Sequence, residues 1–279
     1  MKDFKDKVLV VTGGSSGIGQ AIAKEGALRG MKIIINGMTE AHVEETLDML
    51  RKLGAEAYGL TADISEYENV QKLFDLTMEK FGRVDMLCNN AGVAVSGPIW
   101  EIPLKDIHWI TEVNMMSHLY GMHIFIPQMI KQGTEAEIVN TESTAGIMTS
   151  GNAIMYHATK HAGVAASECA YLSLRQRGLE RIHVHCLMPA FVQTHIHEAD
   201  KRRPERFAID DDPYYKSQEF TSGYVRSEKQ VTAGMPIDYV GTCVFTAIED
   251  EKFYIYTHPE SQVVAGMRVK RMVSGENPQ

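Results

Sequence analysis

The sequence has few cysteines, no excess of positive charge and no long uncharged apolar run. Its cysteines, Cys88, Cys169, Cys186 and Cys243, show neither CxxC nor zinc-knuckle spacing, so we expect reduced core residues. A formal net charge of -8 excludes the basic footprint of a nucleic-acid-binding protein. No run of about 18 apolar residues could span a membrane, and the first seven residues lack a signal-peptide core. The sequence therefore predicts a soluble, cytoplasmic protein.

The composition that remains is that of a globular protein, with 44% hydrophobic and 23% charged residues. A chain of this size buries on the order of 70% of its unfolded surface, so it needs no metal or disulfide for stability. Short β-branched runs alternate with helical stretches. Because parallel neighbours need crossover connections, this alternation predicts an α/β fold, a doubly wound parallel sheet with helices on both faces, in a single domain over residues 1–279.

The residue pattern places the elements along the chain. Strands are expected in KVLVV from Lys7, KIIIN, residues 57–62, VDMLCNN, EIVNT, IHVHCLMP and FYIYT. Helices are expected after the first glycine cluster, at about 40–53, 66–81, 107–131 and 153–178, and after Pro236. The weakly patterned stretch 195–235 is rich in charge, tyrosine and turn residues, and we interpret it as a substrate lid.

The first strand leads directly into a glycine-rich turn, TGGSSGIG, at residues 12–19. Such a turn lets the backbone approach a pyrophosphate at a helix N-terminus, where N–H groups and the helix dipole attract negative charge. The spacing GxxxGxG only approximates the GxGxxG fingerprint, and glycine pairs also form ordinary turns. The turn indicates a dinucleotide site but does not establish one alone.

Further motifs follow in order: Asn89-Asn90-Ala91-Gly92, Asn114, Ser143 and Tyr156-x-x-x-Lys160. Together with the glycine turn they resemble the short-chain dehydrogenases/reductases over nearly the whole chain. The resemblance implies a Rossmann-type fold, a nicotinamide cofactor, a small-molecule substrate and a homotetramer. It also implies an oxidoreductase that interconverts a secondary alcohol and a ketone.

The resemblance implies cofactor contacts from the glycine turn, the strand ends and the catalytic helix. These residues are Gly13, Ser15, Ser16, Gly17, Ile18, Gly19, Gly37, Met38, Thr39, Asp63, Ile64, Asn90, Ala91, Gly92, Tyr156, Lys160, Pro189, Val192 and Thr194. Asp63 would contact adenine, and Val192 and Thr194 would contact the nicotinamide carboxamide.

The choice between coenzymes depends on the end of the second strand, Asn36-Gly37-Met38-Thr39. A carboxylate there normally binds the ribose of NAD and repels the extra phosphate of NADP. No acid is present, although the arginine common in NADP-using relatives is also missing. We predict NADP(H) in preference to NAD(H), with Ser15, Ser16 and Thr39 as candidate phosphate contacts, and keep NAD(H) as the alternative.

Tyr156 and Lys160 share one face of a predicted helix, about one turn apart. A free phenol titrates near about pH 10, and an adjacent ammonium stabilises phenolate, so such a tyrosine can act as acid and base. By the resemblance, Tyr156 protonates the carbonyl oxygen, Ser143 polarises it, Lys160 also holds the nicotinamide ribose, and Asn114 completes a proton relay through water. Taken singly, an exposed Tyr/Lys pair, a capping serine and a packing asparagine are the alternatives.

Two features are not explained by the resemblance. Glu142 precedes the serine, where a small residue is common, and a salt bridge, a substrate contact and solvent exposure all stay open. The basic run at 201–206 is expected on a solvated face or against an acidic substrate tail.

Two histidine pairs are candidates for a metal site, because alternate residues of a strand share a face. Neither His183-x-His185 nor His195-x-His197 has a local carboxylate or cysteine to complete a ligand set, and we predict no metal. His195 and His197 are expected at the mouth of the substrate cleft.

The substrate pocket should lie beyond the carboxyl ends of the strands, beneath the lid. Its expected lining is Val95, Ser143, Ile147, Met148, Tyr156 and Phe191. The lid aromatics Tyr214, Tyr215, Phe220 and Tyr224 favour a bulky, mostly apolar substrate, unless they merely anchor the lid.

Several segments, among them GPIWEIPLKDIHWITEVN, are similar to bacterial Cα-dehydrogenases that oxidise lignin-derived aryl alcohols. Hydroxysteroid and bile-acid dehydrogenases share the same scaffold. We predict a steroid or bile acid first, with an aryl alcohol or a general carbonyl substrate as the alternative. A non-catalytic NAD(P)-binding regulator is the alternative of another class, and the intact set of Tyr156, Lys160, Ser143 and Asn114 favours an enzyme.

Overall fold

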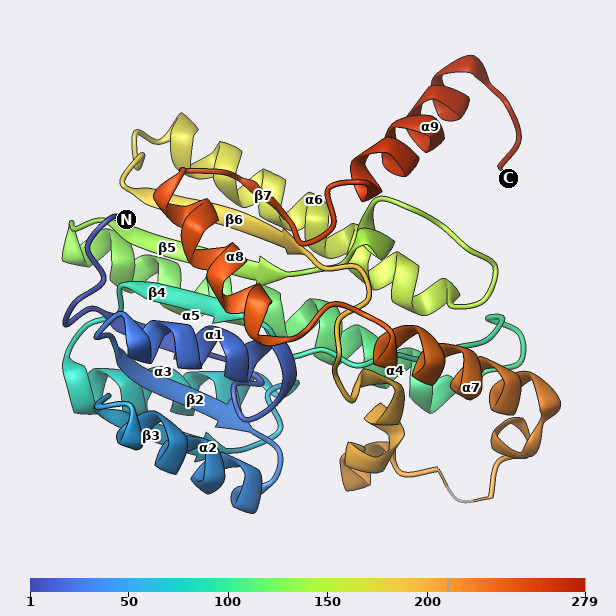
Figure 1. The fold of residues 1–279 in the computed structure, drawn as a ribbon, viewed down its shortest axis with the longest axis horizontal. Coiled ribbons are helices and arrows are strands. Elements are labelled where there is room, and N and C mark those ends of the chain that lie inside the picture. The colour runs from blue at the N-terminus through green and yellow to red at the C-terminus, as the bar shows by residue number, and fades with distance from the viewer. Residues whose placement is uncertain (210, 279) are drawn as a thin grey trace.

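The computed structural model describes residues 1–209 and 211–278; position 210, in the predicted lid, and position 279, at the end of the predicted domain, lie outside the described residues. Its centre is one parallel sheet with the strand order β3-β2-β1-β4-β5-β6-β7 (Figure 1). The strands are β1 (Val8–Val11), β2 (Lys32–Gly37), β3 (Ala57–Thr61), β4 (Met86–Asn89), β5 (Ala136–Thr141), β6 (Ile182–Met188) and β7 (Tyr254–Tyr256). The predicted doubly wound α/β fold is confirmed.

Helices connect the strands and cover both faces of the sheet (Figure 1). The α-helices are α1 (Gly17–Leu28), α2 (Glu40–Lys52), α3 (Tyr67–Phe81), α4 (Leu104–Thr111), α5 (Ser117–Gln132), α6 (Ile154–Gln176), α7 (Gln218–Thr232), α8 (Asp238–Glu249) and α9 (Ser261–Ser274). Shorter segments are the π-helix η1 (Glu112–Met116) and the 3₁₀ helices η2 (Thr144–Gly146), η3 (Ile196–Arg202), η4 (Glu205–Phe207) and η5 (Pro213–Lys216).

Side chains that alternate along the strands build two cores, one on each face of the sheet. On β1, Leu9 and Val11 belong to the core covered by α1, α2 and α8, whereas Val10 belongs to the core under α3, α5 and α6. Successive strand residues point to opposite faces, so strands covered on both sides are apolar throughout. This explains the continuous apolar runs in the sequence.

Two predicted elements differ from the structure. The helix expected at 107–131 consists of three consecutive segments, α4, η1 and α5, and Asn114 lies in the π-helical one. Single π-turns of this kind are frequent at functional sites. The irregular stretch expected at 195–235 contains the helix α7, which sequence patterning missed because its charged and polar residues hide the apolar period.

The cysteine prediction is partly wrong. Cys88 and Cys186 are buried and unpaired, as expected, and Cys243 is partly buried, but Cys169 is exposed on α6. Burial raises the pKa of both the Cys88 and the Cys186 thiol, so both stay protonated.

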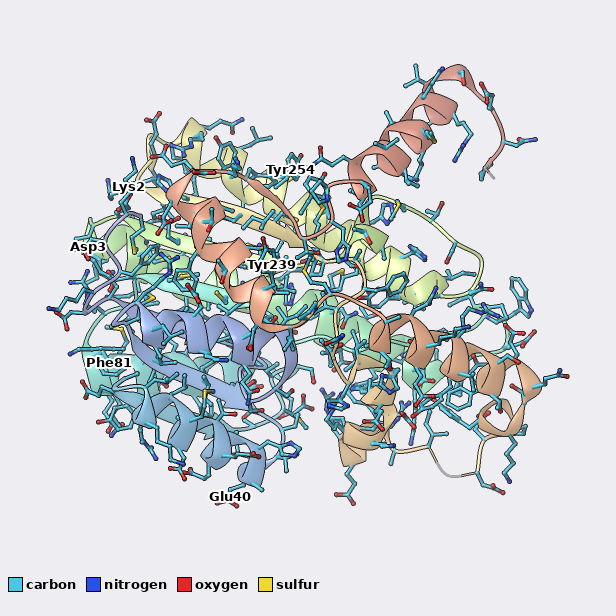
Figure 2. All side chains as sticks on the ribbon, viewed as in Figure 1. Lys2, Asp3, Glu40, Phe81, Tyr239 and Tyr254 are labelled. Carbon is cyan, nitrogen blue, oxygen red and sulfur yellow. The ribbon has the colours of Figure 1, made fainter. Side chains whose placement is uncertain are left out.

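Charged side chains such as Lys2, Asp3 and Glu40 project from the body of the molecule (Figure 2). The helix α9 extends away from that body (Figure 1) and exposes Val263 and Met267. Of the helices in the described ranges, none has the length and apolar character that crossing a membrane requires.

Candidate active site

A cavity of about 780 Å³ opens at the carboxyl ends of the strands, where the strand order reverses between β1 and β4. Open α/β sheets bind ligands at this switch point. All the predicted cofactor residues except Gly19 line the cavity. They are Gly13, Ser15, Ser16, Gly17, Ile18, Gly37, Met38, Thr39, Asp63, Ile64, Asn90, Ala91, Gly92, Tyr156, Lys160, Pro189, Val192 and Thr194.

Close packing explains why the turn after β1 needs glycine. Gly13 has a φ of 61°, and a Cβ there would lie 3.0 Å from the Cα of Ala91. A Cβ on Gly19 would lie 2.4 Å from both the Asn90 Nδ2 and the Gly13 carbonyl oxygen. Gly19 therefore lets α1 pack against the turn. It does not line the cavity, and its predicted cofactor contact stays a prediction.

The start of α1 is suited to an anion. Its N-cap residue, Ser16, makes no side-chain capping hydrogen bond, and Gly17 and Ile18 line the cavity. The first N–H groups of a helix have no partner within the helix, and the helix dipole adds positive potential there. The turn thus fits the pyrophosphate of a dinucleotide.

Thr12 joins the glycine turn to the Asn-Asn-Ala-Gly segment after β4. Its Oγ1 accepts hydrogen bonds from the backbone N–H groups of Asn90 at 2.9 Å and Ala91 at 3.2 Å. Because Thr12 is almost fully buried, these bonds fix the spacing between the two segments on either side of the switch point.

The predicted catalytic residues Ser143, Tyr156 and Lys160 line the same cavity. Ser143 follows β5 and caps η2, since its Oγ accepts from the Ala145 N–H at 3.1 Å and donates to the Pro189 carbonyl at 3.3 Å. The serine is thus both a cap and a hydroxyl at the cavity. On α6, the Lys160 Nζ lies 6.0 Å from the centre of the Tyr156 ring.

Asn114 is fully buried and does not line the cavity. Its Nδ2 donates to the Val93 carbonyl at 2.9 Å, and its Oδ1 accepts from the Val93 N–H at 2.8 Å. The side chain therefore braces the segment that follows β4. The water relay implied by the family resemblance stays a prediction.

Glu142 is buried against the catalytic helix, with 2% of its surface exposed. Its Oε1 lies 3.0 Å from the His118 Nδ1, and its Oε2 lies 3.6 Å from the Lys160 Nζ. Gly163 on α6 leaves the space for this carboxylate, because a Cβ there would lie 2.2 Å from the Glu142 Cδ. Of the three roles that the sequence left open for Glu142, the structure shows the salt bridge and excludes solvent exposure. Glu142 also lines the cavity, so the substrate contact stays a prediction. His118 was missed, because no local pattern connects it with Glu142.

The segment predicted as a lid borders the cavity, its role as a lid stays a prediction, and its aromatics take the alternative role of anchoring it. Parts of 194–196 and of α7 line the cavity, whereas Tyr214, Tyr215, Phe220 and Tyr224 do not. The Tyr214 hydroxyl donates to the Ser96 carbonyl at 2.5 Å, and Phe220 packs on both Tyr214 and Tyr215. The aromatics anchor the segment, so they give no information on substrate size.

The other predicted substrate contacts mostly line the cavity. Val95, Ser143, Met148, Tyr156 and Phe191 do so. Ile147 does not, because it packs against Val164 and Met188 on the side of the sheet under α6. His195 lines the cavity as expected, while His197 instead packs on Tyr224, with ring centres 5.6 Å apart.

The basic run at 201–206 forms ion pairs within the protein. Arg203 bonds to Asp106, and the Arg206 guanidinium contacts Asp63 at 3.2 Å and Glu112 at 2.7 Å. The expectation of a freely solvated face is therefore wrong for these residues. Arg202 of the run lines the cavity, as does Arg226 of α7.

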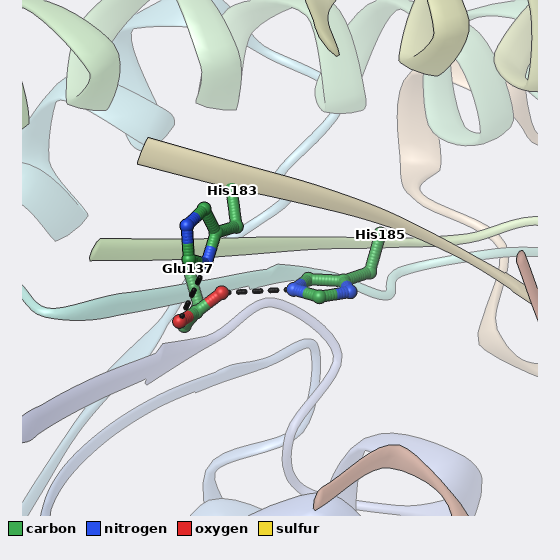
Figure 3. Close-up of side chains that lie close together, drawn as sticks. All are labelled: Glu137, His183 and His185. Carbon is green, nitrogen blue, oxygen red and sulfur yellow. Dashed lines mark hydrogen bonds and ion pairs between the residues drawn. The ribbon is translucent and has the colours of Figure 1, made fainter. Parts of the chain in front are cut away.

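The pair His183 and His185 meets a carboxylate that the local sequence does not supply. Glu137 on the neighbouring strand β5 has its Oε1 3.3 Å from the His183 Nδ1 and its Oε2 2.8 Å from the His185 Nε2 (Figure 3). The strand register places Glu137 opposite His183. The amino group of Met1 also contacts the Glu137 Oε1, at 2.5 Å.

Charge balance explains how Glu137 is tolerated in the core. Burial by itself raises the pKa of Glu137, but hydrogen bonds from His183 and His185 outweigh burial and lower that pKa to about 2. The same carboxylate raises the pKa of His183, against the effect of burial. Three potential ligand atoms of Glu137, His183 and His185 lie within 4.8 Å of one another, so the missing carboxylate is no longer a reason against a metal. The prediction of no metal stays a prediction.

Comparisons with known proteins show the family of this chain. The profile of the short chain dehydrogenase family matches residues 7–205. A "CLA biosynthesis dehydrogenase/reductase" of Lactiplantibacillus plantarum is 41% identical, covering 100% of this chain and 97% of its own. A C alpha-dehydrogenase of a Sphingobium species is 32% identical, covering 93% and 83%. A solved short chain dehydrogenase/reductase of Burkholderia phymatum in complex with NAD has a TM-score of 0.96 at 36% identity, covering 100% and 98%.

Proposed function

Because the chain belongs to the short chain dehydrogenase family and is an NAD(P)-dependent oxidoreductase that acts on alcohol and carbonyl groups, we propose that it interconverts a secondary alcohol and a ketone in a bulky, mostly apolar substrate. The observation that carries the proposal is the cavity of about 780 Å³ that joins Ser143, Tyr156 and Lys160 to the predicted cofactor residues. A cavity of this size holds a ligand of drug-like size or larger.

The proposed mechanism assigns proton chemistry to this chain's own residues. A nicotinamide coenzyme held by the predicted cofactor residues of the cavity would supply hydride chemistry at the substrate carbon. In reduction, the Tyr156 hydroxyl donates its proton to the substrate oxygen and becomes a phenolate. Ser143 donates a hydrogen bond to the same oxygen as negative charge develops on it. The Lys160 ammonium stabilises the phenolate by its charge, and oxidation reverses these steps.

For the coenzyme, we propose NADP(H). In support, the described cavity lining at the end of β2, formed by Gly37, Met38, Thr39 and His42, contains no carboxylate that would repel a ribose phosphate. NAD(H) is the second candidate, favoured by the NAD complex of the 36% identical relative. Turnover measured with each coenzyme at equal concentration distinguishes them.

For the substrate, we propose an apolar body with a negatively charged end. Val95, Trp109 and Met148 provide an apolar wall, and Arg202 and Arg226 also line the cavity. An arginine pairs well with a carboxylate. Bile acids, the first class predicted, and hydroxy fatty acids both have this form. Aryl alcohols remain the alternative, supported by the C alpha-dehydrogenase relative.

The test is nicotinamide absorbance with a panel of a bile acid, a long-chain hydroxy acid, an aryl alcohol and the uncharged methyl esters of both acids. The proposal predicts turnover of at least one acid, and a KM for its ester at least tenfold higher. Equal KM values for acid and ester would exclude the charged end. Coenzyme binding without any turnover across the panel would favour a regulator.

We also propose a homotetramer, as the family resemblance implies. The apolar side chains exposed on α9, such as Val263, Met267 and Met272, are compatible with a contact between copies. Light scattering during gel filtration measures the oligomer directly. The cytoplasmic location stays a prediction from sequence.

A further inference from the structure

The proposed mechanism leaves one buried charge unused, the carboxylate of Glu142 behind the catalytic lysine. Within the described residues, its Oε2 has no hydrogen-bond partner, although the Lys160 Nζ lies only 3.6 Å away. Burying a carboxylate oxygen without a partner is costly. The position of this oxygen therefore needs an explanation, and the adjacent ammonium offers one.

The carboxylate cannot easily move away from the lysine. The Glu142 N–H donates to the Leu187 carbonyl at 2.7 Å, which continues the pairing of β5 with β6. The side chain fills the space opposite Gly163, where even a Cβ would lie 2.2 Å from both carboxylate oxygens. Backbone and packing together hold the carboxylate at one place beneath α6.

Lys160 is held from the side of the strand by one hydrogen bond and one ion pair. Its Nζ donates to the Thr141 carbonyl at 2.8 Å and lies 3.6 Å from the Glu142 Oε2. An ammonium has three N–H donors, so Lys160 has donors beyond the one given to Thr141. Its Nζ also lies 6.0 Å from the centre of the Tyr156 ring.

His118 fixes the orientation of the carboxylate. Its Nε2 lies 3.1 Å from the Ala91 carbonyl oxygen, and its Nδ1 lies 3.0 Å from the Glu142 Oε1. Because His118 holds Oε1, Oε2 is the oxygen that faces Lys160.

One further ionisable group lies near Glu142 and Lys160. From β6, Cys186 interacts electrostatically with both Glu142 and Lys160. Burial raises the pKa of the Cys186 thiol, so it is neutral. Lys160 on α6 and His118 on α5 are the two groups in ion-pair contact with Glu142.

We propose that Glu142, oriented by His118, is a positioning residue that holds the Lys160 ammonium from the strand side and so directs its charge toward Tyr156. The inference rests on the proposed roles of Tyr156 and Lys160. It adds two residues next to Lys160, one just after β5 and one on α5, to the group that acts at the cavity.

The test is a pH titration of the Tyr156 phenolate by ultraviolet difference absorbance, using the full chain without substrate and subtracting the Tyr156→Phe variant as a blank. In Glu142→Gln, the amide can donate to the His118 Nδ1 and accept from Lys160, so the side-chain volume is nearly kept while the carboxylate charge is removed. Loss of the ion pair loosens the ammonium, and the titration midpoint should rise by about one pH unit. The matched control is Glu137→Gln, at the other end of β5, which should leave the midpoint unchanged.

The direction of the shift decides the proposal. If Glu142 acted only through its field, its removal would favour the phenolate and lower the midpoint, and a lower or unchanged midpoint overturns the proposal. If Glu142→Gln fails to fold, Glu142→Asp replaces it in the test, because aspartate keeps the charge but is too short to reach Lys160 in the same way. The same upward shift of the midpoint is then expected. A midpoint equal to that of the wild type would overturn the proposal.

Steady-state kinetics provide a second readout. With a substrate from the panel, Glu142→Gln should lower kcat about tenfold with KM nearly unchanged, whereas a KM effect alone contradicts positioning. If the wild type shows no Tyr156 phenolate signal, the proposed acid/base role itself fails. That result is distinct from a normal signal that Glu142→Gln does not shift.

Discussion

Strand β5 has a buried glutamate near each end, and the two have opposite surroundings. Glu137, near the amino end, is contacted by His183, His185 and the amino group of Met1, all within 3.3 Å. Glu142, just beyond the carboxyl end, contacts His118 and has its second oxygen beside Lys160. One carboxylate has nitrogen partners on both oxygens, and the other has an oxygen beside the lysine that we propose acts in catalysis.

The difference follows from the polarity of a parallel sheet. Ligands bind at the carboxyl ends of the strands, where the cavity lies. A buried charge at the amino end can only affect folding, because no described cavity residue contacts it. A buried charge at the carboxyl end can affect the reacting groups. We therefore propose that similar Glu–His chemistry contributes to stability at one end and to catalysis at the other.

The largest expected effect is on catalysis at the cavity. Tyr156→Phe removes the acid/base hydroxyl and should lower kcat by roughly 10²- to 10⁴-fold. Coenzyme affinity, measured by fluorescence quenching, should stay nearly intact, and so should the urea midpoint. Retained turnover would refute the assigned acid/base.

The second largest expected effect is on the stability of the protein, through the buried Glu137 near the amino end of β5. Glu137→Gln leaves His183 and His185 without their carboxylate in the core and should lower the free energy of unfolding by about 3 kcal/mol. Urea denaturation measures this change. Turnover per folded molecule should equal that of the wild type, and a loss of turnover would break the distinction between the two ends.

The same buried pair gives a pH dependence of stability. The pKa of Glu137 is lowered from 4.5 to about 2 by folding, so its contribution is present above about pH 4.5 and lost as the pH falls toward 2. His183 has a raised pKa, so its contribution is present below the ordinary value of 6.5 and lost as the pH rises through the raised value. Urea midpoints across this range should show both steps in the wild type. Neither step should remain in Glu137→Gln.

The smallest expected effect is the energetic coupling between the buried glutamates at the two ends of β5. Glu137 and Glu142 are separated by five residues of extended chain, roughly 17 Å, and share no contacting partner. The free-energy changes of Glu137→Gln and Glu142→Gln should add within about 0.5 kcal/mol in the double variant. A larger coupling would mean that the strand transmits strain between them.

Sequence patterning could predict the sheet, most helices and the cavity lining, because these depend on local periodicity and on motifs such as Tyr156-x-x-x-Lys160. It could not predict Glu142 with His118 or Glu137 with His185, since these partners come from different elements and meet only through strand register and helix packing. The lid aromatics were misassigned for a related reason. Composition shows that Tyr214 and Phe220 are present but not whether they face a cavity or each other.

The most direct test is kcat per folded molecule for the wild type, Glu137→Gln, Glu142→Gln and Tyr156→Phe, measured by nicotinamide absorbance with one turned-over substrate. The expected order is wild type equal to Glu137→Gln, then Glu142→Gln about tenfold lower, then Tyr156→Phe lowest. If Glu137→Gln lowered kcat as much as Glu142→Gln, the assignment of stability to one end of β5 and catalysis to the other would be contradicted.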